Sequence, residues 1–475
     1  DRQVLQKMQM DLDNLRAAWT WATDQAALNW LEQSCHALAQ FYQLVSFYAE
    51  AEVAFGRAVA QLQTIAGDGT HAHSDEAAPF ATAQERLLAQ LQVEQAHACA
   101  RLAQFEKAER LAQTARHVGE TLTDYRILAQ AALCVSLIHG SGGNFAGVRT
   151  AAEAAVGYAR QGALPDLEAA ALSDLGSAYL ALGDVSYGLA QLHHALTVDR
   201  RRNFYVEAGI YTNLGAGYQM AGDFLNARRY LQHALDSYRS LNLIGINANA
   251  LLMLGELHIQ LGQYELASTY IQEAQEVAKG VGRYDAEAQA WSLFALLAYH
   301  QGELAVAEQR CRYARQMAVH YHLSPSKALT ELIQGHLFVE QAQWQAAGAA
   351  YTQAQRASAA MAQPVQTTRA QAGLAQVWLG VGNAGQAVAQ VESILPQLEQ
   401  RKQHSGAELY ETLWICYQVL TAVADPRAVV LLQQGYQLLQ AQAARLADKN
   451  MRHAFLTQVA VNRALLAAAQ AASLP

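Results

Sequence analysis

The chain has 475 residues, a formal net charge of −8 and a hydrophobic content of 52%. A chain of this length ordinarily forms two or three globular domains, and the negative charge argues weakly against general nucleic-acid binding. It contains no run of about 18 or more apolar residues, which excludes a membrane-spanning helix. Its five cysteines are odd in number and widely spaced, so we expect reduced thiols in a cytoplasmic protein rather than disulfides or a metal site. No secretory signal opens the chain. It begins at Asp1 without a Met, and we therefore expect it to be a fragment of a longer protein.

The first 30 residues are predicted to form a linking or capping helix. One apolar stripe at helical spacing is formed by Met8, Leu12, Leu15, Trp19 and Ala22. Residues 11–22 read Asp-Leu-Asp-Asn-Leu-Arg-Ala-Ala-Trp-Thr-Trp-Ala. This segment resembles the one where bacterial signal-transduction ATPases of the STAND class pass from their nucleotide-binding and winged-helix modules into a repeat sensor. The alternative is a helix that only covers the first repeat, and both can hold, because a linking helix must also pack.

A repeat of about 40 residues fills the interior of the chain. The segment Leu214-Gly215-Ala216-Gly217-Tyr218, followed by Gly222-Asp223-Phe224, recurs 39 residues earlier and 40 residues later. Two antiparallel helices approach closely only where a side chain is small. That small residue falls at Ala39, Ala96, Ser136, Gly176, Gly215, Gly255, Ala295, Gly335 and Ala375. Gly222 is expected to end the first helix of its pair, and Asp223 to cap the second.

These positions resemble the tetratricopeptide repeat (TPR) family. The resemblance implies an all-α fold, a right-handed TPR superhelix (an α-solenoid) of about ten helix pairs with extra N- and C-terminal helices. We assign residues 31–440 to the array. Its period of about 40 residues exceeds the family's usual period of about 34, so we expect helices longer than usual.

An insertion interrupts the period near residues 66–83, where we expect a flexible loop. Its composition is small and polar, with Gly67, Gly69 and Pro79. His71 and His73, with neighbouring carboxylates, have the residue types of a metal site. A flexible loop does not fix ligands rigidly, so we expect no metal there.

Residues 441–475 are predicted to be a C-terminal capping helix. Its apolar stripe is formed by Met451, Phe455, Val459 and Leu466. The segment at 448–463 resembles the closing segment of the same ATPase-linked sensors, with a Leu-Arg-x-x-Phe-Leu-x-x-Val-x-x-Asn-Arg pattern. Covering the end of the array is again the alternative.

No set of residues with catalytic spacing is present. The glycine-rich segment at 140–145 lacks the Gly-Lys-Ser/Thr ending of a P-loop, and Ser324-Pro-Ser-Lys327 lacks the companion motifs of an S-x-x-K enzyme. We therefore predict that the chain is not an enzyme and holds no cofactor. ATP and Mg²⁺ are expected only in an upstream module outside this chain.

A series of cations follows the second helices of consecutive repeats. Its members are Arg160, Arg200, Arg201, Arg239 and Lys279. A cation at a helix C-terminus gains about 0.3–1 kcal/mol from the helix dipole, which is the simpler interpretation. The alternative is contact with an anion or an acidic peptide.

The resemblance to TPR arrays also implies a ligand site, because their first helices line a concave groove. On this register the groove residues are Asn213, Gln219, Asn249, Leu252, Glu256, Ile259, Ser292, Leu296, Tyr299 and His336. The mixture of polar and apolar groups suits a peptide, a protein segment or a small molecule.

The leading hypothesis is therefore the sensor of a STAND ATPase, in which an inducer bound in the groove relieves autoinhibition of the chain's own upstream module. The alternative is a free-standing TPR scaffold for protein–protein interactions. In either case we expect a monomer with no direct nucleic-acid or membrane partner.

Overall fold

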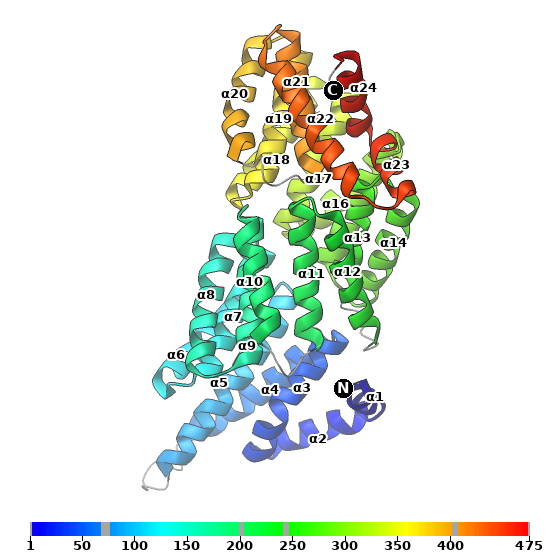
Figure 1. Ribbon diagram of the computed structural model, residues 1–475. Coiled ribbons are helices and arrows are strands. Elements are labelled where there is room, and N and C mark those ends of the chain that lie inside the picture. The colour runs from blue at the N-terminus through cyan, green and yellow to red at the C-terminus, as the bar shows by residue number, and fades with distance from the viewer. Residues whose placement is uncertain (1, 68–76, 199–203, 241–246, 401–406, 474–475) are drawn as a thin grey trace. The chain divides into compact units, whose positions relative to one another are not determined.

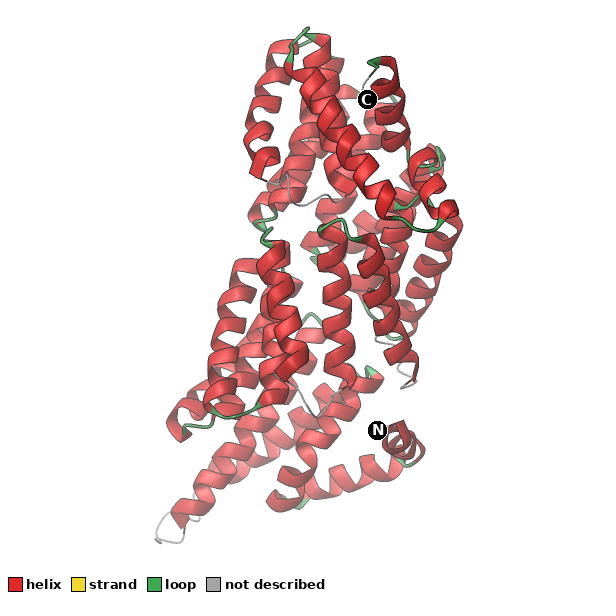
Figure 2. Cartoon of the chain, viewed as in Figure 1, coloured by secondary structure: helices red, strands yellow, loops and turns green. Residues whose placement is uncertain are grey.

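The computed structural model describes residues 2–67, 77–198, 204–240, 247–400 and 407–473. Every regular element in these ranges is an α-helix (Figures 1 and 2). The N-terminal half contains α1 (Arg2–Met10), α2 (Leu12–Asp24), α3 (Leu28–Val45), α4 (Tyr48–Gly67), α5 (Ala77–Arg101), α6 (Phe105–Leu122), α7 (Tyr125–Ser141), α8 (Phe145–Gln161), α9 (Pro165–Ala181), α10 (Val185–Val198), α11 (Phe204–Met220) and α12 (Phe224–Ser240). The C-terminal half contains α13 (Ala248–Gln260), α14 (Tyr264–Gly280), α15 (Tyr284–His300), α16 (Leu304–His320), α17 (Ser324–Glu340), α18 (Trp344–Ala360), α19 (Pro364–Gly380), α20 (Ala384–Gln400), α21 (Ala407–Ala422), α22 (Arg427–Arg445), α23 (Lys449–Thr457) and α24 (Ala460–Ala471).

The helices α3 to α22 form ten pairs within the described ranges, flanked by α1 and α2 at one end and by α23 and α24 at the other. This confirms the predicted all-α helical-repeat fold of the α-solenoid class. By their internal contacts the residues form two compact units. Unit 1 comprises residues 1–178, 190–210 and 236–246, and unit 2 comprises residues 179–189, 211–235 and 247–475. The sequence period does not predict this division.

A 20-residue spacing produces the 40-residue repeat. From α14 to α20 every helix has 17 residues, and the next begins after a three-residue turn. The middle residue of each of these turns has a positive φ, and three of the six are not glycine: His322, Ala342 and Ala362. A left-handed conformation costs a non-glycine residue roughly 1–2 kcal/mol. The packing of successive helices therefore imposes the turn even where glycine is missing.

The small residues of the first helices lie where the second helices cross them. A β-carbon added to Gly215 would lie 2.5 Å from the Leu231 side chain, and one added to Gly255 would lie 2.5 Å from Ile271. The Asp223 carboxylate accepts a hydrogen bond from the backbone N–H of Asn226 at 3.1 Å. The predicted register and the predicted N-cap are both confirmed at these positions.

The N-terminal segment is two helices rather than the single predicted one, because the chain breaks at Asp11 between α1 and α2. The helix α2 packs on α4. The indole N–H of Trp19 donates to the Ala54 carbonyl at 3.2 Å, and its ring meets Phe55 edge-on. Arg16 pairs with Glu50 at 2.6 Å.

The segment at 66–83, for which the sequence predicts a loop, is helical at both of its ends. The helix α4 extends to Gly67, and α5 begins at Ala77, so residues 77–83 are helical. Residues 68–76, with the histidines considered as metal ligands, lie outside the described ranges.

The C-terminal helices pack against helices far earlier in unit 2. Buried side chains of α22 to α24 share one apolar cluster with side chains of α12 to α15. The Phe455 ring contacts both Phe224 and Tyr410, and the Tyr264 hydroxyl donates to the Gln458 carbonyl at 3.1 Å. Figure 1 shows α23 beside α14. The tail therefore forms part of the core of unit 2.

The sequence pattern at 448–463 fixes the corner between α23 and α24. The Asp448 carboxylate caps α23 by accepting from the N–H groups of Asn450 and Met451. Arg452 donates to the Leu446 carbonyl at 2.7 Å, Asn462 to the Phe455 carbonyl at 2.9 Å, and Arg463 to the Thr457 carbonyl at 3.0 Å. The pattern thus has a structural role in this chain.

Replacing Gly262 by alanine tests the docking of the tail. The new β-carbon would lie 2.6 Å from the Ala454 carbonyl oxygen of α23, at a φ of +69°. The matched control is Gly302→Ala, which has a φ of +80° and no atom within 4 Å of the new β-carbon. We expect faster hydrogen exchange in residues 449–471 for Gly262→Ala only, because both variants share the backbone strain. Equal exchange in the two variants would contradict the docking.

Candidate functional site

Polar side chains gather on the first helices of unit 2. We define the inner polar cluster as Glu256 of α13, Tyr299 and His300 of α15, His336 and Glu340 of α17, Tyr351 of α18, Arg369 of α19, and Glu408 and Glu411 of α21. The helical-repeat packing places each of these first helices beside the next, so residues one period apart come together.

The centre of the inner polar cluster is an ion pair between α19 and α21. The Arg369 guanidinium donates to the Glu411 carboxylate at 3.0 Å through Nη2 and at 3.3 Å through Nε. Only 13% of the Arg369 side chain and 26% of the Glu411 side chain are exposed. A charge in such a position must be paired, because an uncompensated one costs several kcal/mol.

His336 connects this pair to the aromatic part of the cluster. Its Nε2 lies 3.3 Å from Glu411, and its Nδ1 lies 2.9 Å from the Tyr351 hydroxyl. The Tyr299 ring stacks on the imidazole with centroids 5.6 Å apart, and its hydroxyl donates to Glu340 at 3.4 Å. The network thus joins α15, α17, α18 and α21.

Two glycines make room for the Tyr351 ring. A β-carbon on either Gly335 or Gly373 would overlap that ring. The ring is fully buried, and it takes the second-helix position held by Leu231 and Ile271 in earlier repeats. The glycine of the repeat therefore serves here to deliver a hydroxyl group to His336.

Burial and charge displace the pKa values in the cluster. Burial alone would raise the pKa of the Glu411 carboxyl, but His336 and Arg369 more than offset it and lower the pKa to about 2. Burial lowers the pKa of His300 to about 4 and also lowers that of His336. Burial, and then the charge of Glu408, raise the pKa of Glu256 to about 7. At neutral pH the cluster therefore contains the Arg369–Glu411 ion pair, a neutral His300 imidazole and a partly protonated Glu256 carboxyl.

The structure brings three of the ten predicted groove residues into the inner polar cluster: Glu256, Tyr299 and His336. Three others do not face an open groove, since Leu252 is 0%, Ile259 2% and Ser292 0% exposed. Leu252 and Ile259 belong to the apolar cluster shared with the tail, and Ser292 is bonded to Thr330 at 3.0 Å. The inner surface of unit 2 is covered at these points by the protein's own side chains.

The remaining four lie outside the inner polar cluster. Asn249 is exposed and accepts from Arg283 at 3.1 Å. Asn213 and Leu296 are half-buried. Gln219 is buried, and its side-chain oxygen has no hydrogen-bond partner among the described residues. Their role in ligand binding remains a prediction.

Sequence reasoning missed Arg369 and Glu411. Arg369 lies three 40-residue periods after Asn249, so extending the register of the first helices would have found it. Glu411 gave no such signal, because the tenth pair departs from the regular spacing after α20.

The cationic series is only partly described. Arg200 and Arg201 lie outside the described ranges. Arg160 pairs with Glu168 at 2.7 Å, and Arg239 and Lys279 are exposed in the last turns of α12 and α14. The last-turn positions agree with the helix-dipole interpretation.

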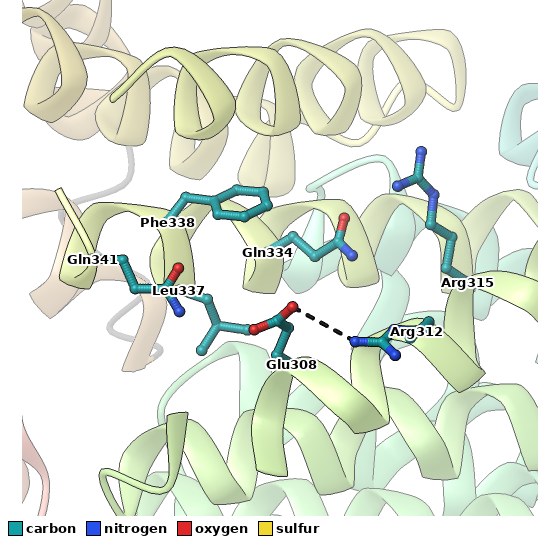
Figure 3. Close-up of a pocket in the computed structure, with 7 residues that line it drawn as sticks. All are labelled: Glu308, Arg312, Arg315, Gln334, Leu337, Phe338 and Gln341. Atoms are coloured by element: carbon teal, nitrogen blue, oxygen red, sulfur yellow. Dashed lines mark ion pairs between the residues drawn. The ribbon is translucent and has the colours of Figure 1, made fainter. Parts of the chain in front are cut away.

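A separate pocket of about 190 Å³ lies between α16 and α17, lined by Glu308, Arg312, Arg315, Gln334, Leu337, Phe338 and Gln341 (Figure 3). Its α17 residues follow a spacing of three and four and so occupy a different face of that helix from His336 and Glu340. Within the described ranges, no group of three or more His, Cys, Asp or Glu side chains is placed to hold a metal ion. No described helix is long and apolar enough to cross a bilayer.

The sequence matches no protein-family model and no curated protein. Several solved structures are similar. The crystal structure of a Rap protein complexed with Competence and Sporulation Factor has 14% identity and a TM-score of 0.51, over 81% of this chain and 99% of that one. NprR in complex with its cognate peptide NprX has 11% identity and a TM-score of 0.45, over 80% and 98% of the two chains.

A STAND protein with a tetratricopeptide repeat sensor from Pyrococcus horikoshii has 12% identity and a TM-score of 0.41, over 77% of this chain and 55% of that one. At such identities the likeness concerns the fold alone, and only the Rap protein's TM-score exceeds 0.5 among these three. Together with the repeat register, that likeness supports a helical-repeat fold of the TPR type.

The raised pKa of Glu256 predicts a pH-dependent effect of Glu256→Gln. A carboxyl whose pKa rises on folding stabilises the folded state fully below its unfolded pKa of about 4.5, and this contribution is lost as pH rises through about 7. We therefore expect Glu256→Gln to raise the melting temperature at pH 8, with a smaller difference at pH 5. The exposed Glu265 of α14 gives the control, Glu265→Gln. A difference that does not grow with pH would contradict the burial of Glu256.

Proposed function

We propose that the chain is the ligand-sensing domain of a cytoplasmic STAND-class signalling ATPase. In this proposal an inducer (a peptide, a protein or a small molecule) binds the first-helix face and relieves autoinhibition of an upstream nucleotide-binding module. The observation that carries the sensing role is the inner polar cluster, because buried ionic groups rarely stabilise a fold more than apolar packing does. A binding role accounts for their presence where packing does not.

The Rap likeness supports a binding domain. That structure is a complex with Competence and Sporulation Factor, and the similarity extends over most of this chain. A shared fold does not assign a ligand, so the support is for the kind of work and not for the molecule bound.

Ligand binding would act through competition for the inner polar cluster. Arg369, Glu411 and His336 already satisfy one another, so a charged or hydrogen-bonding ligand must replace one of these partners. Such exchange moves α17, α19 or α21 relative to its neighbours. The ligand then favours whichever arrangement of the first helices it contacts best.

The STAND assignment depends on the two sequence resemblances, and three large exposed apolar side chains near the N-terminus are consistent with it. Met10 of α1, Trp21 of α2 and Trp30 of α3 are 89%, 56% and 65% exposed. A contiguous patch of such side chains would mark an interaction site, and these three belong to the first three helices, next to the end at which an upstream module would join. The free-standing scaffold remains the second candidate, since the same side chains suit a separate partner.

Two measurements separate the candidates. A Gly-x-x-x-x-Gly-Lys-Ser/Thr segment encoded upstream of Asp1 would support the sensor, and its absence would favour the scaffold.

In the full-length protein, we expect Trp21→Ser with Trp30→Ser to raise basal ATPase activity, because the restraining contact is weakened. The control is Val381→Ser with Val430→Ser, which removes exposed apolar groups from α19–α20 and α22 of unit 2. Unchanged basal activity in the tryptophan variant would contradict restraint through this surface.

A further inference from the structure

We propose that the pocket between α16 and α17 binds a carboxylate attached to a short apolar group. The pocket is lined by two guanidinium groups, two amides, two apolar side chains and one carboxylate. This inference does not rest on the proposed sensor function, because the pocket lies on a different face of α17 from the inner polar cluster.

The cations of the pocket are available to a ligand. The Arg312 guanidinium lies 3.6 Å from Glu308, and both side chains are at least half exposed. The Arg315 guanidinium lies 3.3 Å from Glu331. In the part of the chain that the structure describes, neither arginine donates a hydrogen bond to a protein acceptor. The Arg312–Glu308 pair is exposed, and exposed pairs contribute little, about 0–1 kcal/mol, so a ligand displaces Glu308 at small cost. The Arg315 side chain is 47% exposed, so it can contact a ligand while it stays beside the buried Glu331.

The charge balance favours an anion over a cation. The lining contains two guanidinium groups, those of Arg312 and Arg315, and a single carboxylate, that of Glu308, which Figure 3 shows paired with Arg312. The other nearby carboxyl, Glu331, is only 2% exposed, and its burial raises its pKa although Arg315 and Lys327 act in the opposite direction. A ligand carboxylate would accept charge-assisted hydrogen bonds from the guanidinium groups, which are stronger than neutral ones.

The rest of the lining sets the size and nature of the ligand's body. Leu337 and Phe338 form the apolar wall, and Gln334 and Gln341 place amide groups along the same face of α17. The volume of about 190 Å³ is below the roughly 300–1,000 Å³ of pockets that enclose drug-sized ligands. The pocket therefore fits a group the size of one amino-acid side chain or a short-chain acid.

The test uses two small probes and one matched neutral compound, observed by saturation-transfer NMR on the intact chain. 4-Methylpentanoate presents the carboxylate on a free acid. N-Acetylglutamic acid α-amide presents it as a peptide side chain, and 4-methylpentanamide lacks the charge. We expect millimolar binding of at least one carboxylate and about tenfold weaker binding of the neutral amide, the loss that follows from removing hydrogen bonds to a charged group. Tighter binding of the free acid assigns the site to small organic acids, and tighter binding of the glutamate derivative assigns it to an acidic peptide.

Variants locate the site. Arg312→Gln and Arg315→Gln should each weaken binding about tenfold, whereas Arg356→Gln on the exposed face of α18 should not change it. Glu308→Gln should strengthen binding, because it removes the carboxylate that competes for Arg312, whereas Glu265→Gln should leave binding unchanged. If Arg315→Gln unfolds the chain by leaving Glu331 unpaired, Arg315→Gln with Glu331→Gln gives the same measurement. Equal binding of acid and neutral amide, or equal effects of Arg312→Gln and Arg356→Gln, would overturn the proposal.

Discussion

The ion pair between Arg369 and Glu411 is the interaction around which the interior of unit 2 is arranged. A guanidinium only 13% exposed needs a carboxylate, and Glu411 supplies it from the neighbouring first helix. The second carboxylate oxygen of Glu411 contacts His336, and His336 is in turn hydrogen-bonded to the Tyr351 hydroxyl. Two glycines then clear the space that the Tyr351 ring requires. Charge pairing thus explains a set of residues that the repeat alone does not.

The interior of unit 2 is filled by apolar side chains as well as by the inner polar cluster. The first helices of unit 2 share an apolar cluster with α22, α23 and α24. Gln260 of α13 also reaches Glu408 of α21 at 3.5 Å, although 148 residues separate them. A ligand on this face must therefore compete with the chain's own groups. Under the proposed sensor function, binding on this face would therefore be coupled to a rearrangement of the helices.

The repeat register predicted most of the fold correctly. It predicted ten helix pairs, the crossing points at Gly215 and Gly255, and the cap at Asp223, because each follows from contacts within one period. It did not predict the break at Asp11, since one apolar stripe continues through both α1 and α2. It also placed Leu252 and Ile259 on the concave groove, where the structure buries them in the apolar cluster shared with the tail. Periodicity shows which face of a helix points inward, but not whether a later part of the chain covers that face.

The same limit applies to the candidate site. The register predicts Glu256, Tyr299 and His336 because they lie on the corresponding face of successive first helices. Arg369 lies on the same register, three periods beyond Asn249. Glu411 follows the end of the regular spacing, and its partners are set by tertiary contact alone. The αL residues His322, Ala342 and Ala362 are a further case, because nothing in their side chains signals a turn. Packing of the flanking helices decides their conformation.

The most direct test of this account is a double-mutant cycle on Arg369 and Glu411, read by native-state hydrogen exchange of the amides in α19 and α21. Local opening is the suitable observable because two compact units need not unfold together. We expect Arg369→Gln and Glu411→Gln each to lower the opening free energy by roughly 3 kcal/mol, as for a broken buried pair. The double variant should then lose less than the sum of the two by at least about 1 kcal/mol. Effects that add to within about 0.5 kcal/mol would contradict the pairing that organises the interior of unit 2.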